Sequence, residues 1–286
     1  MTDSRLGRRI LDQLRVELSE RDEEILRRLV NLRFMTTTQV REMVFHEKRT
    51  SGAGLRAANR ALAKLRASGL VTALDRRIGG VRAGSGSYVW TLTEGGARLC
   101  DNTTRSRRDR RREPSRTFLE HHLAVTEATV RLYAATRGTR TAVQAVQAEP
   151  DCWRPYNGPD GVRLTLKPDL AVTTRSDDFD DHWFFEIDLD TEPPSRIIRK
   201  SRQYEAYRRT GLEQRQLGVF PAVVWLVPDD KRRKQLERHL ADADLDANVF
   251  VVITLDELPA LVARGVHDFI KHTGGQKGGN PHESIT

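Results

Sequence analysis

One short stretch constrains the fold of this chain more than any other, because apolar and acidic side chains alternate along it. It runs from His182 to Asp190 and reads HWFFEIDLD. Successive side chains of a β-strand point to opposite faces of the sheet, so one face is apolar and the other gathers carboxylates. Carboxylates that share a face repel one another and resist burial. The stretch therefore predicts a strand whose acidic face, formed by Glu186, Asp188 and Asp190, needs a cation.

A further carboxylate is expected on the preceding strand, which the sequence places between residue 162 and about residue 173. There Asp169 follows Pro168, and pairing of the two strands would bring it beside the acidic face. Sites made only of oxygen ligands suit hard divalent cations. We therefore predict a Mg²⁺ or Mn²⁺ site formed by Asp169, Glu186 and Asp188.

The next helix, expected over residues 194–209, is cationic and contains two tyrosines, Tyr204 and Tyr207. A basic side chain beside metal-bound carboxylates suits a phosphodiester substrate, because it offsets the negative charge that builds up on the reacting phosphate. A lysine or an arginine of this helix is the expected source of that charge.

The charge of the chain is divided unevenly between its two halves. Residues 1–116 hold 26 Lys and Arg against 14 Asp and Glu, a net charge of +12, whereas residues 117–286 have a net charge of −4. Forty of the 48 basic residues are arginines, which suit phosphates and guanine edges, although a GC-rich genome gives the same ratio. The segregation predicts that the basic half faces a polyanion.

The basic half is expected to form three helices followed by a β-hairpin. Ser19 and Asp22 mark the first helix start, a threonine cluster at 36–38 caps a short second helix, and Gly69 ends the third. Strands at 70–74 and 88–92 then enclose a tip rich in Gly, Arg and Ser. This order is that of a winged helix-turn-helix.

The third helix of such a domain lies in the major groove of DNA, while the wing contacts the backbone or the minor groove. Winged helices also serve as protein-docking modules, but the net charge of +12 favours DNA. The predicted DNA-binding residues are Arg56, Asn59, Arg60 and Lys64 on the helix, and Arg77 and Arg82 in the wing.

Residues 105–116 carry seven arginines and no apolar residue, which is typical of a linker. Two interpretations stay open, a solvated tether and a segment that follows phosphates between the domains. The second adds Arg107, Arg108, Arg110 and Arg111 to the predicted DNA-binding residues.

The acidic half is expected to contain a helix, three strands, the basic helix and a further strand. This order resembles the restriction-endonuclease-like PD-(D/E)XK core, and the resemblance is carried by Pro168-Asp169 and by Glu186-Ile187-Asp188. Together with the preceding winged helix, the chain resembles the replication-relaxation family of plasmids and integrative elements. The short motifs that carry this second resemblance are LSERD at 18–22, LTEGG at 92–96 and HHLAV at 121–125, with Lys200 and Tyr204 after the acidic strand.

The resemblance implies an α+β or α/β fold and a protein of plasmid replication or mobilisation that nicks or relaxes DNA. It adds Glu120, on the helix before the strands, as a candidate metal ligand. The sequence patterns predict a domain order of an N-terminal segment (1–18), a winged helix (19–102), an Arg-rich linker (103–116), a nuclease-like domain (117–272) and a disordered tail (273–286). Double-stranded DNA at an origin-like site is the expected partner, and a second copy or relaxosome and replication proteins are further candidates.

One position departs from the nuclease pattern. A lysine normally follows the second carboxylate by two residues, but Asp188 stands there. Either the cation has migrated to Lys200 or to Lys167, or the site has lost catalysis. The two function hypotheses are therefore a metal-dependent DNA nicking enzyme and a DNA-binding regulator or replication accessory with an inactive nuclease-like domain.

Other chemistries have less support in the sequence. His121 and His122 are adjacent and point about 100° apart on a helix, so they suit a two-histidine metal site poorly. Tyr204 or Tyr207 could act as a nucleophile only with an activating partner. The aspartates at 177–181 lack the spacing of a calcium loop, and no phosphate-binding Gly-rich loop is present.

The expected location is the cytoplasm. No apolar run reaches membrane-spanning length, the first residues lack the apolar stretch of a secretion signal, and two cysteines cannot make a disulfide framework.

Overall fold

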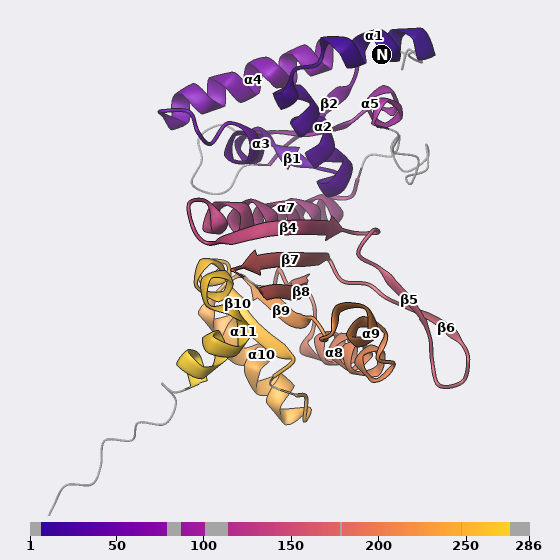
Figure 1. Cartoon of the computed structure of the whole chain (residues 1–286), viewed down its shortest axis with the longest axis vertical. Helices are drawn as coiled ribbons and strands as arrows, with labels where there is room; N and C mark the ends of the chain where they lie inside the picture. Colours follow the sequence, from indigo (N-terminus) through magenta and orange to yellow (C-terminus); the bar gives the residue numbers. More distant parts are fainter. Residues whose placement is uncertain (1–6, 79–86, 101–113, 178, 247, 275–286) are drawn as a thin grey trace, which may run out of the picture. The chain divides into compact units, whose positions relative to one another are not determined.

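The computed structural model describes residues 7–78, 87–100, 114–177, 179–246 and 248–274. The chain is a mixed α and β protein with two compact units, residues 1–130 and 131–286 (Figure 1). The boundary falls inside helix α7 (Arg116–Thr136), later than the domain start expected at 117. The first turns of α7 belong to the N-terminal unit because they bond to it. Gln39 Nε2 donates to Leu123 O at 3.1 Å, and Thr126 Oγ1 donates to Phe34 O at 2.8 Å.

The N-terminal unit contains the expected three helices and hairpin, preceded by one further helix. The antiparallel sheet has the order β1-β3-β2, and the two-residue strand β1, which the sequence did not predict, pairs Met35 with Trp90. Its elements are α1 (Arg8–Glu17), α2 (Glu20–Leu32), β1 (Met35–Thr36), α3 (Thr37–Val44), α4 (Ser51–Ala67), β2 (Val71–Ile78), β3 (Ser87–Leu92) and α5 (Glu94–Leu99).

Capping boxes fix where two of these helices begin. Ser19 accepts from the backbone N–H of Asp22, whose carboxylate accepts in return from the N–H of Ser19. Thr36 and Gln39 form the same reciprocal pair at the start of α3. Each box satisfies two N–H groups that a helix start otherwise leaves without a partner. The expected start at Ser19 is confirmed.

Gly96 in α5 lies against the backbone of Leu70, and a Cβ at this position would meet Leu70 O at 2.0 Å. We expect Gly96→Ala to lower the free energy of unfolding by about 3 kcal/mol, because backbone atoms cannot move aside as a flexible side chain can. Urea denaturation measures the effect.

Gly52→Ala is the matched control, since its Cβ would meet only Arg56 Nη1 at 3.5 Å. Alanine also has the higher helix propensity, so the stability of this variant should stay equal or rise slightly. Equal losses in both variants would contradict the close packing of Gly96.

The C-terminal unit is built on a five-stranded mixed sheet with the order β10-β9-β8-β7-β4. Strands β8, β9 and β10 run parallel, while β4, β7 and β8 are antiparallel neighbours. The elements that follow α7 are β4 (Thr141–Ala148), β5 (Arg154–Asn157), β6 (Arg163–Leu166), β7 (Leu170–Ser176), β8 (Phe179–Ile187), α8 (Pro194–Arg209), α9 (Leu212–Leu217), β9 (Ala222–Val227), α10 (Asp230–Asp242), β10 (Phe250–Thr254) and α11 (Leu258–Gly274).

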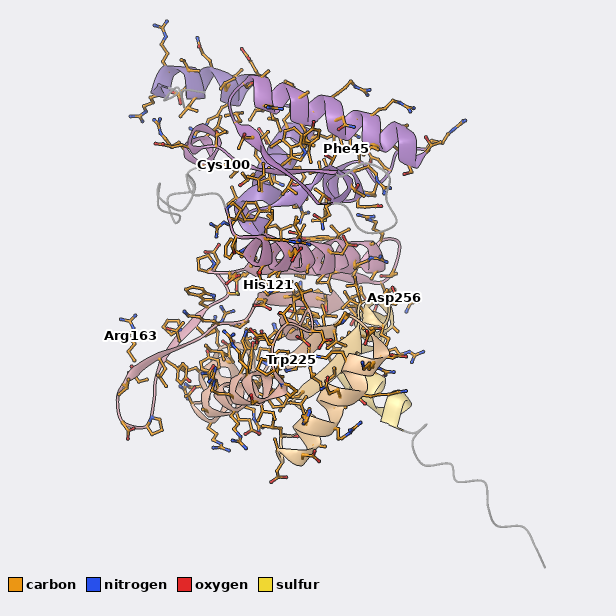
Figure 2. The ribbon with its side chains drawn as sticks, turned by 180° about the vertical axis from the view of Figure 1, so that it is seen from behind. Phe45, Cys100, His121, Arg163, Trp225 and Asp256 are labelled. Carbon is orange, nitrogen blue, oxygen red and sulfur yellow. The ribbon has the colours of Figure 1, made fainter. Side chains whose placement is uncertain are left out.

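The strand expected at 162–173 is wrong as a single element. It divides at Lys167-Pro168-Asp169 into β6 and β7, because proline lacks the N–H that a central ladder needs. Strand β6 instead pairs with β5 in a two-stranded hairpin that carries Arg163 and projects from the sheet (Figure 2). The acidic strand also begins earlier than expected, at Phe179, and ends at Ile187.

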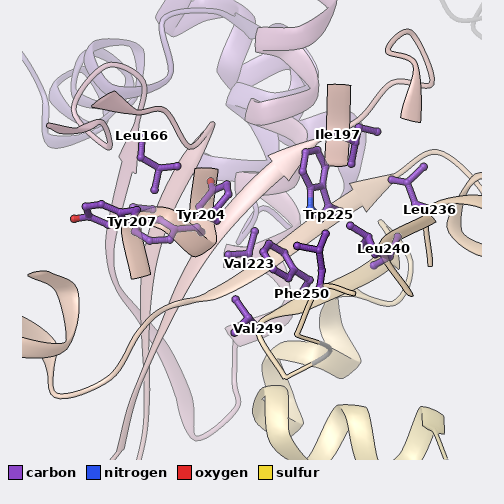
Figure 3. Close-up of a cluster of buried hydrophobic side chains, with 14 of the residues drawn as sticks. Leu166, Ile197, Tyr204, Tyr207, Val223, Trp225, Leu236, Leu240, Val249 and Phe250 are labelled. Carbon is purple, nitrogen blue, oxygen red and sulfur yellow. The ribbon is translucent and has the colours of Figure 1, made fainter. Parts of the chain in front are cut away.

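One face of the sheet packs against α8 and α10. Tyr204 and Ile197 of α8 and Leu236 of α10 share a buried cluster with Trp225 of β9 and Phe250 of β10 (Figure 3). Glu186 follows Phe184, a member of the same cluster, by two residues along β8, so its side chain points to this covered face. Glu186, the acidic residue of this face that lies within β8, is therefore buried on the face that α8 and α10 cover. Within the described ranges, no helix is long and apolar enough to cross a membrane.

Candidate active site

The two predicted carboxylates Asp169 and Glu186 meet where β7 begins and β8 ends. The antiparallel register places Leu170 opposite Phe185. Asp169, the residue before β7, therefore lies beside the last residues of β8. Asp169 N–H donates to Phe185 O at 3.1 Å, and Asp169 Oδ2 accepts from the N–H of Ile187 at 2.7 Å. The backbone of β8 therefore holds Asp169 on both sides of Glu186, through the backbone N–H of Asp169 at Phe185 and through its carboxylate at Ile187.

Lys200 joins this pair from helix α8. Its ammonium group donates to Glu186 Oε2 and lies 3.9 Å from Asp169 Oδ1. Tyr204, one helical turn further on, donates its hydroxyl proton to Glu186 Oε1. The Glu186 side chain is 1% exposed, while Lys200 keeps 28% of its side chain exposed. Of the two lysines that could have replaced the missing one, the structure brings Lys200 to the carboxylates.

Burial governs the protonation of this group. Burial raises the pKa of Glu186 to about 8, and the positive charge of Lys200 offsets this only in part. Burial lowers the pKa of Lys200, but the charges of Glu186 and Asp169 outweigh it, so that this pKa is raised. Lys200 therefore stays charged over the range in which Glu186 exchanges a proton near neutral pH.

Asp188 does not join the cluster, contrary to the sequence prediction. It is 5% exposed and forms a two-point ion pair with Arg232 of α10, with Nε to Oδ2 at 2.6 Å and Nη2 to Oδ1 at 3.3 Å. Asp190 is exposed and also pairs with Arg232, at 3.0 Å. Because regular pairing of β8 ends at Ile187, these two aspartates turn toward α10. Among the described residues, no group of three acidic, histidine or cysteine side chains could hold a metal ion.

Sequence reasoning missed Arg232, although a signal was present. It lies in a helix of mostly exposed basic residues, but it shares the i, i+4, i+8 stripe with Leu236 and Leu240, which are buried. A basic residue on an apolar stripe needs a buried partner. That partner is Asp188, which the sequence pattern alone places at the predicted metal site.

Three other predicted residues have contacts of their own. Lys167 Nζ lies 4.3 Å above the ring of Trp153, a cation–π contact. Glu120 lies in the N-terminal unit and accepts from Arg116 Nε at 2.8 Å. His122 is buried against Phe34 and Phe118 in that same unit, so it is an aromatic packing residue. The role of Glu120 as a ligand stays a prediction.

Neither tyrosine of α8 is placed to act as a nucleophile. Tyr204 is fully buried, and burial together with the Glu186 charge raises its pKa well above the ordinary value. Tyr207 is 3% exposed and donates to Glu213 Oε1 at 2.7 Å. A phenol with a raised pKa is a weaker nucleophile at neutral pH.

The predicted DNA-binding residues fall into three groups. Arg56, Asn59 and Arg60 are exposed on α4. Lys64 is exposed as well, but its ammonium donates to Asp22 Oδ2 at 2.7 Å and so supports the capping box of α2. Arg77 belongs to strand β2, and its side chain lies outside the described residues, as do Arg82, Arg107, Arg108, Arg110 and Arg111.

The residues present fit a hard divalent cation. Two carboxylates from neighbouring strands already face one positive charge, the ammonium of Lys200. Mg²⁺ in phosphoryl-transfer sites is held by one or two carboxylates together with waters and substrate phosphates. Asp169 and Glu186 are two carboxylates of this kind, and a site of that composition would not require Asp188.

Fold and site define a two-unit α and β protein whose C-terminal sheet carries an acidic pair with a lysine. The sequence pattern of the replication-relaxation family matches residues 26–223, and the chain belongs to this family. The match spans Asp169, Glu186 and Lys200 and ends before Arg232. The recognition made from the short motifs is confirmed, and the family makes the chain a replication-related protein.

Comparison with solved structures gives the restriction endonuclease FokI bound to DNA, at 12% identity and a TM-score of 0.27. The match covers 88% of this chain and 46% of that chain, so this chain spans about half the length of FokI. A likeness at this TM-score carries no argument about fold or function. Among curated proteins, no sequence matches.

Proposed function

We propose that this chain is a DNA-binding protein of plasmid or mobile-element replication or mobilisation, and that it nicks DNA in a metal-dependent reaction. One observation carries the proposal. The carboxylates of Asp169 and Glu186 and the ammonium of Lys200 converge at one end of the sheet, although 31 residues of sequence separate the first from the last. Two acids and one lysine are the parts that the nuclease pattern requires.

In this proposal Asp169 and Glu186 would hold Mg²⁺ or Mn²⁺, and such an ion would supply activation of water and charge stabilisation at the leaving 3′ oxygen. The backbone N–H of Ile187 orients Asp169 by its bond to Oδ2. Tyr204 orients Glu186 from the buried side. Lys200, which is partly exposed, directs its charge at the scissile phosphate and offsets the negative charge that develops there.

The N-terminal unit supplies DNA binding as a winged helix. Its helices α2, α3 and α4 and its β2–β3 hairpin follow the order of that domain, and α4 corresponds to the helix that enters the major groove. The exposed side chains of Arg56, Asn59 and Arg60 support this role, because a groove-binding helix must present polar groups to base edges and phosphates.

We expect Arg56→Ala/Arg60→Ala to weaken binding to duplex DNA and to reduce the slope of log affinity against log salt by up to about 2, since each phosphate contact contributes roughly 0.9. Fluorescence anisotropy with a labelled duplex over a salt series measures both quantities. Arg27→Ala is the control, because Arg27 is 67% exposed on α2 and pairs with Glu24. If the control and the double variant lose affinity equally, α4 is not the DNA-contacting helix.

The nicking activity is tested with supercoiled plasmid that carries the origin of the element. Wild-type protein with Mn²⁺ should convert it to the open circular form, and EDTA should prevent the conversion. Asp169→Asn should lack the activity. No nicked product from wild type with Mg²⁺ or with Mn²⁺ would reject the enzyme hypothesis.

A second candidate function is a DNA-binding regulator or replication accessory with an inactive nuclease-like unit. The observation that favours it is the neutralisation of the acidic face by the chain itself, with Lys200 on Glu186 and Arg232 on Asp188. On this hypothesis the wild type binds the origin but leaves it uncut, and a Lys200→Met variant binds the origin as wild type does.

A further inference from the structure

Arg232 is a buried side chain beside the turn that connects strand β8 to helix α8. Its side chain is 4% exposed, although arginine is almost never this buried without partners. The guanidinium group has five N–H donors. In this structure it makes five hydrogen-bond or ion-pair contacts, to Asp188 twice, to Asp190, to Gln235 and to the backbone of Glu192.

These contacts tie three segments together. Asp188 directly follows β8, Glu192 lies in the turn that leads into α8, and Gln235 lies on α10 with Arg232 itself. Arg232 Nη2 donates to Glu192 O at 2.7 Å, and Asp188 Oδ1 also accepts from the N–H of Asp190 at 3.1 Å. Arg232 of α10 therefore contacts the turn between Glu186 and Lys200 at both of its ends, at Asp188 and at Glu192.

The backbone of this turn needs such a clamp. Asp190 has a φ of 58°, in the left-handed region that non-glycine residues rarely adopt. A conformation of this kind persists only when its surroundings fix it. Downstream of the turn, α8 and α10 pack together in the cluster that contains Ile197 and Leu236 (Figure 3). The angle at which α8 leaves the turn sets where Lys200 meets Glu186.

We propose that Arg232 is a positioning residue for the candidate active site: by clamping the turn 188–192, it holds Lys200 of α8 against Glu186 and Asp169. It lies outside the part of the chain matched by the family, and it occupies Asp188, the residue that stands where the nuclease pattern has its lysine. The reaction assigned to Lys200 rests on the proposed function, whereas the clamp itself does not.

The test uses the full chain and compares Arg232→Lys with Arg154→Lys. Lysine keeps the charge but cannot reach Asp188, Asp190 and Glu192 together. Arg154 is the matched control, because it also pairs with a buried carboxylate of the same unit, Glu213, at 3.0 Å. The first measurement is the rate at which an amine-reactive ester modifies Lys200, read by mass spectrometry. The second is kcat and KM for nicking.

Arg232→Lys should raise the rate of Lys200 modification roughly tenfold, because opening of the turn frees the ammonium from Glu186. Arg154→Lys should leave that rate within about twofold of wild type, even if it lowers stability equally. In the nicking assay Arg232→Lys should lower kcat with little change in KM. Equal rates of Lys200 modification in the two variants would overturn the proposal. Absence of nicking by wild type would reject the proposed function, and the modification rates would still decide the role of Arg232.

Discussion

If the proposed function holds, replacing Lys200 by Met should lower the rate of DNA nicking by roughly 100-fold or more, because the reacting phosphate would lose the positive charge that contacts both Asp169 and Glu186. Affinity for duplex DNA should change little, since the predicted DNA-contacting residues of α4 belong to the other compact unit. Single-turnover nicking of supercoiled plasmid, with protein in excess over DNA, isolates the chemical step.

Lys167→Met is the matched control for this prediction. Lys167 was the alternative position for the migrated cation, is exposed, and lies over Trp153 instead of the carboxylates. Its replacement should leave the nicking rate within about twofold of wild type. A large loss of nicking in Lys167→Met together with wild-type nicking in Lys200→Met would show that Lys167, and not Lys200, supplies the positive charge.

The second large effect concerns stability against pH in metal-free protein. Glu186 has a pKa of about 8 when folded, above its value in an unfolded chain, because burial disfavours the charged form. Between the two values the folded state holds a proton that the unfolded state has lost. Stability therefore falls as pH rises, by at most about 1.4 kcal/mol per pH unit, and the loss is complete above the folded pKa.

Glutamine does not titrate, so Glu186→Gln should lack this dependence of stability on pH. From pH 5 to pH 9 the free energy of unfolding of wild type should fall relative to that of Glu186→Gln. Urea denaturation in EDTA measures both values. Parallel curves for the two proteins over this range would show that Glu186 does not carry the raised pKa.

Much of the C-terminal unit could be predicted because its signals are local. The alternation at 182–190 identifies β8 and the buried face of Glu186, and the resemblance to the nuclease pattern pairs this residue with Asp169. Helix α8 and the position of Lys200 follow from a proline start and a basic helical repeat. Ser19 and Asp22 likewise marked the start of α2.

The parts that could not be predicted depend on contacts far apart in the sequence. Asp188 is bound by Arg232, 44 residues later, and alternation along one strand contains no information about that partner. The two-residue strand β1 is defined by its pairing with Val89 and Trp90 of β3, which lie more than 50 residues later. The order of elements in the sequence predicts that helix α7 begins the second domain. Hydrogen bonds to Gln39 and Phe34 instead make its first turns part of the first unit.

If Asp169 and Glu186 form the proposed metal site, binding of Mn²⁺ should depend on their carboxylates. Electron paramagnetic resonance measures the concentration of free Mn²⁺ when the ion is titrated into wild type, Asp169→Asn or Glu213→Gln. Glu213 is the control, since it is buried in the same unit and pairs with Arg154. Wild type and Glu213→Gln should bind the ion alike, and Asp169→Asn should bind it at least about tenfold more weakly. Equal affinity of Asp169→Asn and wild type for Mn²⁺ would show that Asp169 is not a metal ligand.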